Sequence, residues 1–281
     1  MPKKRHSPNG FEIPRSGIME VSMELTVLNP GFEYMIEGIM AFQTEDTSAF
    51  WSEPLYHIYP QLDKKYADSL SFPDRKKYME EVLKNVYVDL ESALNEKVAR
   101  YSKHWEEYRD QITGALSEAF DLDCSSLFND MQCNISMNPI EPRFLEERTF
   151  DVFYQNSERR AIGTAIHEMI HFVWFYVWNR TFCDSYEEYE SPSMKWILSE
   201  MVVESVMKDP RLSSINPYFP REEGGCIYPY FFDMKADGKL ILETLDEMYH
   251  NQGIVDFMKN SYAYCIQHEQ EIREHIKRSE Q

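Results

Sequence analysis

Apolar residues recur three or four positions apart along most of the chain, which is the spacing of one face of an α-helix. Between Pro73 and Phe120 this spacing is continuous. We expect one helical section there, with Pro73 in its first turn. Further helices are expected over residues 196–207, near 238–250 and near 254–277. The pattern therefore predicts a predominantly helical protein.

Alternation of apolar and polar residues, which is typical of a strand, is confined to short segments. Residues 19–27 alternate in this way, and residues 133–140 and 149–155 are two further candidate strands. We therefore expect an α+β fold with a small sheet. It divides into a disordered tail over 1–17, a mostly helical N-terminal region over 18–120 and a core over 121–281. No linker composition marks the boundary near 120, so the last two can form one domain.

The segment after Ser157, a suitable N-cap, is apolar on almost every side and predicts a buried helix. Its apolar residues are Ala161, Ile162, Ala165, Ile166, Met169, Ile170, Phe172, Val173, Trp174, Phe175, Val177 and Trp178. One polar stripe interrupts them, formed by Arg160, Thr164, His167, Glu168 and His171. Buried polar groups need partners. One interpretation is that both histidines are core residues whose hydrogen bonds are made within the protein, beside a carboxylate. The whole polar stripe favours a metal site instead.

The spacing of the two histidines suits a single ion. His167 and His171 are four positions apart and project from the same helix face, so both imidazoles can meet one metal. Glu168 lies about 100° further round the helix, where it can reach a water on the ion. Two neutral imidazoles with a carboxylate beside the water are what zinc-assisted hydrolysis requires.

The run T-A-I-H-E-M-I-H-F-V, residues 164–173, resembles the zinc-binding helix of the zincin metallopeptidases. The metzincin class has Gly and His where this chain has Trp174 and Val177, which excludes that class. Resemblance to the gluzincin class implies a third zinc ligand, a Glu on a second helix, and an acidic residue four positions later that holds the first histidine. Glu200 and Glu204 occupy these two places, although gluzincins more often carry Asp at the second.

Two other interpretations of the acidic residues stay open. Glu200 and Glu204 can form a solvent-exposed stripe with Lys208, although their apolar neighbours make burial there costly without a cation. A rival third ligand can come from an acidic run among Ser and Tyr in a predicted loop. That run consists of Asp184, Glu187, Glu188 and Glu190.

Hydrolysis at such a site also needs a donor that stabilises the oxyanion. The candidates are Tyr228, Tyr230, His250, Tyr262 and His268. Tyr228 and Tyr230 are favoured, because a Gly-Gly pair before them and a Pro between them suggest a loop that folds over a cleft. The resemblance further implies that strand 149–155 lies at the sheet edge and binds an extended substrate by β-addition.

The composition of the chain excludes some classes of binding partner. The 281 residues carry 29 basic and 48 acidic side chains, a net charge of −19, which repels phosphate backbones and argues against a nucleic-acid partner. No segment approaches the ~18 consecutive apolar residues of a membrane helix. The basic start M-P-K-K-R-H is not followed by an apolar stretch, so no secretory signal is expected. Five scattered cysteines without C-x-x-C spacing are best interpreted as reduced thiols of a cytoplasmic protein.

Together these features predict a zinc metallopeptidase with one Zn²⁺ per chain, bound by His167, His171 and Glu200, that acts on a peptide or protein. Glu168 is the expected general base, and no membrane or nucleic-acid partner is expected. Two alternatives remain: a zinc sensor that uses the same frame without turnover, and a helical interaction protein with a chance motif. An intact Glu168 argues against the sensor. The sequence leaves the oligomeric state open.

Overall fold

The structure is a computed structural model that describes residues 23–125, 127, 129–185, 189–216 and 225–280. The predicted tail over 1–17 and the acidic residues Glu187 and Glu188 lie outside these ranges. The first half contains β1 (Leu25–Leu28), α1 (Phe32–Ala41), α2 (Ala49–Ile58), α3 (Lys64–Asp68), α4 (Phe72–Ala119), β2 (Met131–Ser136), β3 (Arg143–Phe144) and β4 (Thr149–Phe153). The second half contains α5 (Glu158–Phe182), α6 (Met194–Lys208), α7 (Pro210–Ser213), the 3₁₀ helix η3 (Pro229–Phe231), β5 (Lys235–Ala236), β6 (Lys239–Leu240), α8 (Ile241–Asn251), α9 (Ile254–Gln267) and α10 (Glu269–Ser279). The predicted predominantly helical α+β class is confirmed.

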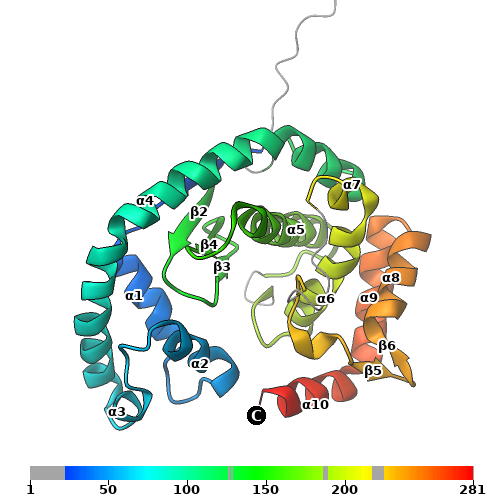
Figure 1. Cartoon of the computed structure of the whole chain (residues 1–281). Helices are drawn as coiled ribbons and strands as arrows, with labels where there is room; N and C mark the ends of the chain where they lie inside the picture. The colour runs from blue at the N-terminus through cyan, green and yellow to red at the C-terminus, as the bar shows by residue number, and fades with distance from the viewer. Residues whose placement is uncertain (1–22, 126, 128, 186–188, 217–224, 281) are drawn as a thin grey trace, which may run out of the picture.

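Helix α4 forms the outer wall of one side of the molecule. Ser71 caps it by accepting a hydrogen bond from the backbone N–H of Asp74, and Pro73 lies in its first turn, as predicted. The long apolar stripe is buried through the whole helix, including Met79, Leu94 and Ile112. Figure 1 shows α4 curving around the protein with α1 and α2 on the inner side of the curve.

The four-stranded sheet consists of strands from the first half of the chain. Its order is β1-β2-β4-β3, with β1, β2 and β4 parallel and β3 antiparallel to β4. The strands expected near 19–27, 133–140 and 149–155 correspond to the described strands β1, β2 and β4. Strand 149–155 is not the edge strand that we expected, because β3 pairs with it through Arg143↔Phe150. The two-residue β3 is too short to leave an alternation in the sequence.

Helix α5 runs through the centre, where α4, α6, α9 and β4 pack around it. Ser157 caps its start by accepting from the N–H of Arg160, and Cys183 ends it in the left-handed conformation (φ 57°). The surrounding elements explain why this helix is apolar on all sides. No helix within the described ranges has both the length and the apolar character needed to cross a bilayer.

The C-terminal part contains three helices where we expected two. The predicted helix over 254–277 is interrupted at His268, which separates α9 from α10. The His268 side chain is buried between Asp237, 3.6 Å away, and Glu271, 2.7 Å away. These contacts come from the β5–β6 turn and from α10, so the break depends on tertiary packing that helical spacing does not encode.

Candidate metal centre

Two helices bring three side chains together at the centre of the molecule. His167 and His171 project from one face of α5, and their Nε2 atoms lie 3.0 Å apart. Glu200 approaches from α6, with Oε2 3.4 Å from His167 Nε2 and Oε1 3.4 Å from His171 Nε2. All three side chains are largely buried; the His171 ring has no exposed surface.

This triangle has the dimensions of a zinc site. Zinc–ligand bonds of ~2.0–2.1 Å at tetrahedral angles place neighbouring ligand atoms about 3.3 Å apart. The two Nε2 atoms lie 3.0 Å apart, and each lies 3.4 Å from a different oxygen of Glu200, His167 from Oε2 and His171 from Oε1, which is close to that spacing. The polar contacts of His171 are all made at Nε2, the atom that faces His167 and Glu200. The residues therefore fit a tetrahedral ion with one position left for water or substrate.

Glu168 lies beside the triangle rather than in it. Its Oε1 is 3.9 Å from His167 Nε2, which is further than either Glu200 contact. The possible ligand atoms of His167, Glu168 and His171 still lie within 4.8 Å of one another, so Glu168 can reach a molecule bound at the open position. Burial raises the pKa of Glu168 to about 7, although His167 and Arg143 oppose the shift. A carboxylate with such a pKa is suited to proton transfer near neutral pH.

The protonation states of His171 and Glu200 also suit a metal. For His167, burial acts to lower the pKa, but Glu168 and Glu200 outweigh it and raise that pKa in the absence of an ion. Burial lowers the pKa of His171 to about 3, with Arg143 acting in the same direction, so this imidazole is neutral. Burial alone would raise the pKa of Glu200, but His171, His167 and Arg143 outweigh it and hold the pKa well below its ordinary range. A neutral imidazole and an ionised carboxylate are the forms that bind zinc.

Arg143 is a site residue that the sequence analysis missed. It projects from β3, its side chain is 7% exposed, and its Nη1 lies 3.3 Å from Glu200 Oε1 and 3.6 Å from Glu168 Oε2. The guanidinium therefore balances part of the charge of two buried carboxylates. Its neighbours in the sequence are Pro142, Phe144 and nearby charged residues, a pattern that also fits an exposed loop, so nothing local pointed to it.

Glu204 does not hold His167 as we expected. The Nδ1 atom of His167 lies 2.8 Å from the backbone carbonyl of Cys226, which supplies the outer hydrogen bond of this ring. Glu204 is buried on α6, and its carboxylate forms an ion pair with Lys208 one turn later. Thus the carbonyl of a loop, rather than the carboxylate of α6, orients the first histidine.

The segment Gly225–Tyr228 is attached to α5 at two points. Its Gly225 carbonyl accepts a hydrogen bond from Arg160 Nη1 at 3.0 Å, and its Cys226 carbonyl contacts His167. Gly225 has a φ of +64°, and a Cβ there would lie 2.5 Å from the Phe232 ring, so only glycine fits. This backbone path brings Tyr228 over the metal centre.

The five oxyanion candidates are placed very differently. Tyr228 is half-buried and lines the space around Glu168 and Glu200; burial and these two carboxylates raise its pKa, so its hydroxyl stays protonated. Tyr230 stacks behind it, and its hydroxyl has no hydrogen-bond partner among the described residues. The other three candidates lie elsewhere: His250 is exposed on α8, Tyr262 packs against Trp178, and His268 lies between its carboxylates.

Two cavities meet at the centre. One, of about 360 Å³, extends toward α2 and the segment Gly225–Tyr228, and the other, of about 440 Å³, extends toward Arg143 and α10. They share the walls Trp51, Ile140, Glu141, His167, Glu168, Glu200 and Tyr228. Of the rival acidic ligands, Glu190 lines the second cavity, whereas Asp184 is paired with Lys195 at 2.6 Å.

The structure thus brings together His167, Glu168, His171 and Glu200, adds Tyr228, and places Glu204 and Tyr230 outside the cavities. No protein-family model, curated protein or solved structure matches this chain. Support for a function comes from the geometry and chemistry of these residues.

Proposed function

We propose that the protein is a zinc-dependent peptidase of gluzincin type, in which His167, His171 and Glu200 bind one zinc ion per chain. The observation that carries this proposal is the triangle of ligand atoms with a buried carboxylate beside it. Bound zinc would polarise the scissile carbonyl and activate a water molecule. The separations of 3.0, 3.4 and 3.4 Å and the neutral state of His171 support zinc as the ion.

The chain supplies the proton transfers. Glu168 takes a proton from the attacking water at its carboxylate and passes it to the leaving amine, for which a pKa of about 7 is well matched. The hydroxyl of Tyr228, which stays protonated, donates a hydrogen bond to the developing oxyanion. Arg143 keeps Glu168 and Glu200 in place through its contacts of 3.6 and 3.3 Å.

The substrate backbone has a place beside β3. This strand pairs with β4 on one side, and Pro142 and Arg143 line the second cavity. An extended peptide added along this edge would run toward Glu168, by the same β-addition that we first assigned to strand 149–155.

Metal analysis combined with a peptide-digestion assay tests the proposal. We expect one zinc per chain, lost in His171→Ala and in Glu200→Ala, and hydrolysis of unstructured peptides by the zinc-loaded protein. Glu190→Ala is the matched control, because Glu190 is an acidic residue of the cavity wall outside the triangle. Zinc lost from Glu190→Ala but kept by Glu200→Ala shows that the third ligand is misassigned. Stoichiometric zinc without hydrolysis of any peptide supports a sensor instead.

A further inference from the structure

Helix α2 covers the metal centre with aromatic side chains. Trp51 packs edge-on against Tyr228 with ring centroids 5.1 Å apart, and Phe50 contacts Tyr228 at 6.2 Å and Tyr230 at 5.5 Å. Trp51 and Tyr228 line both cavities, as do Glu168 and Glu200. The aromatic pair Trp51–Tyr228 therefore closes the cleft where the two cavities meet. We call α2 and this pair the roof of the site.

The composition of α2 is unusual for a core helix. Leu55 is its only buried residue among ten described positions, and Phe50 and Trp51 are half-buried. Large aromatic residues contribute most to stability when they are fully buried. Both line the wall of a cleft, but Phe50 also packs against the hydrophobic core, so Trp51 is the residue that core packing does not account for.

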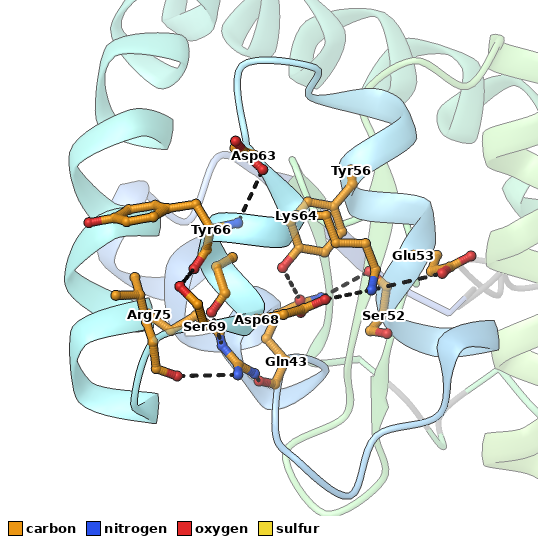
Figure 2. Close-up of polar contacts among 12 residues, drawn as sticks. Gln43, Ser52, Glu53, Tyr56, Asp63, Lys64, Tyr66, Asp68, Ser69 and Arg75 are labelled. Carbon is orange, nitrogen blue, oxygen red and sulfur yellow. Dashed lines mark hydrogen bonds and ion pairs between the residues drawn. The ribbon is translucent and has the colours of Figure 1, made fainter.

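The roof is attached to α4 through Gln43, as Figure 2 shows. Gln43 donates from Nε2 to the Ser52 carbonyl at 3.1 Å and accepts from the Tyr56 hydroxyl at 3.0 Å, so it holds α2 at two points. Its own carbonyl accepts from Arg75 Nη1 of α4 at 2.6 Å. Arg75 is 8% exposed and also donates from Nε to the Ala67 carbonyl at 3.0 Å. Buried charged hydrogen bonds of this kind fix geometry strongly.

Two other parts of the chain, α3 and Glu280 after α10, also lie beside the roof. Lys64 of α3 lies 3.9 Å from Glu53 of α2, but both side chains are substantially exposed, so this pair adds little. On the opposite side, Trp51 and Glu280, which follows the end of α10, line the same cavity. The roof is therefore held mainly from α4, through Gln43 and Arg75.

The space beneath the roof is small. Glu168 is 6% exposed and Glu200 3%, whereas a scissile carbonyl must bring its water within ~3 Å of the general base. Cavities of about 360 and 440 Å³ are of the size that holds small ligands, in the range of ~300–1,000 Å³. A loop on a folded protein needs an open groove to reach such buried atoms.

We propose, on the basis of the peptidase function above, that the roof restricts the substrates to short, unstructured peptides and that Trp51 is a specificity-determining residue. Short peptides enter the two cavities from their ends and extend beneath the Trp51–Tyr228 pair. Longer chains and folded proteins are excluded because their continuation collides with α2.

The test is a pair of fluorogenic peptides, one short and one long, that share the same scissile segment. For the wild-type protein we expect kcat/KM to be at least about tenfold higher for the short peptide, which corresponds to about 1.4 kcal/mol. Trp51→Ala opens the roof and should bring the ratio close to one. Phe50→Ala is a second variant that widens the cleft by a smaller amount. Tyr66→Ala, an aromatic residue 52% exposed on α3, is the matched control and should keep the wild-type ratio.

A binding measurement tests the length restriction without relying on peptide cleavage. The same two peptides are titrated into zinc-loaded Glu168→Gln protein, and we expect the short peptide to bind at least about tenfold more tightly. If both peptides have equal kcat/KM in the wild type and equal Kd in Glu168→Gln, the proposed length restriction is wrong, whereas the proposed peptidase function still stands. If the short peptide binds more tightly but the wild type cleaves neither peptide, the length restriction is supported and the peptidase function is wrong. A Trp51→Ala ratio unchanged from wild type shows that Trp51 is not the determinant.

Discussion

Replacing Glu168 with glutamine separates the catalytic cost from the stability cost of this carboxylate. Glutamine has nearly the same shape but cannot accept a proton, so we expect zinc to remain bound while hydrolysis falls by ~10²–10⁴-fold, the usual contribution of a general base. Arg143 keeps its contact of 3.3 Å with Glu200 in this variant, so the pocket should not collapse.

The same substitution should stabilise the metal-free protein at neutral pH. Burial raises the pKa of Glu168 from 4.5 to about 7, so the folded protein holds a proton that the unfolded chain has released over that range. The stability that this group contributes is complete below pH 4.5 and is lost as the pH rises through 7. The loss is about 3 kcal/mol, since each pKa unit corresponds to ~1.36 kcal/mol. Glu168→Gln has no titrating carboxyl at this position, so it should not show this pH-dependent loss of stability.

Urea unfolding of both metal-free proteins at pH 4.5 and pH 8 measures the effect. We expect the wild type to lose about 3 kcal/mol more than Glu168→Gln between these values. Groups that do not interact with Glu168 cancel in the difference, whereas His167, whose pKa Glu168 raises, does not. Parallel pH profiles would contradict a buried Glu168 of raised pKa, and near-normal turnover by zinc-loaded Glu168→Gln would remove this residue from the mechanism.

Three other substitutions test further parts of the structure. Glu204→Gln should keep its zinc affinity within about twofold, far from the ~10–100-fold loss typical of a ligand's hydrogen-bond partner, because Cys226 holds His167; a chelator competition measures this. Tyr228→Phe should lower kcat about 10–100-fold with KM little changed if its hydroxyl stabilises the oxyanion, and steady-state kinetics on a short peptide decides it. Burial raises the pKa of Asp151 to about 6 from 3.8, so its contribution to stability is lost as the pH rises through 6; urea unfolding of Asp151→Asn should show about 2 kcal/mol less loss than wild type between pH 4 and pH 7.

Several features were predictable because their causes are local. Pro73 in the first turn of α4, the Ser157 cap of α5 and the uninterrupted apolar spacing of α4 each act within one helix, and the structure confirms all three. The polar stripe of α5 is also local, because residues four apart share a helix face wherever the helix lies. The sequence by itself therefore determined the class of fold and the two histidines with Glu168 beside them.

The other features of the site depend on which helices and loops pack against each other. Glu200 was expected from resemblance, but only the packing of α6 on α5 places its oxygens 3.4 Å from both imidazoles. The partner of His167 is a backbone carbonyl, which every residue possesses, so no residue type could identify Cys226. Periodicity tells which face of a helix is buried, and it is silent on what that face touches.

Arg143 and α2 show the same limit most clearly. Arg143 lies on a strand of two residues, and Trp51 on a helix with one buried position, so neither segment carries a pattern that distinguishes it from a surface loop. Both acquire their meaning from contacts with residues far along the chain: Arg143 with Glu200, and Trp51 with Tyr228. The sequence determined the chemistry of the centre, and the tertiary structure alone decided its charge balance, its outer hydrogen bonds and its roof, because these arise from atoms that only folding brings within a few ångströms of each other.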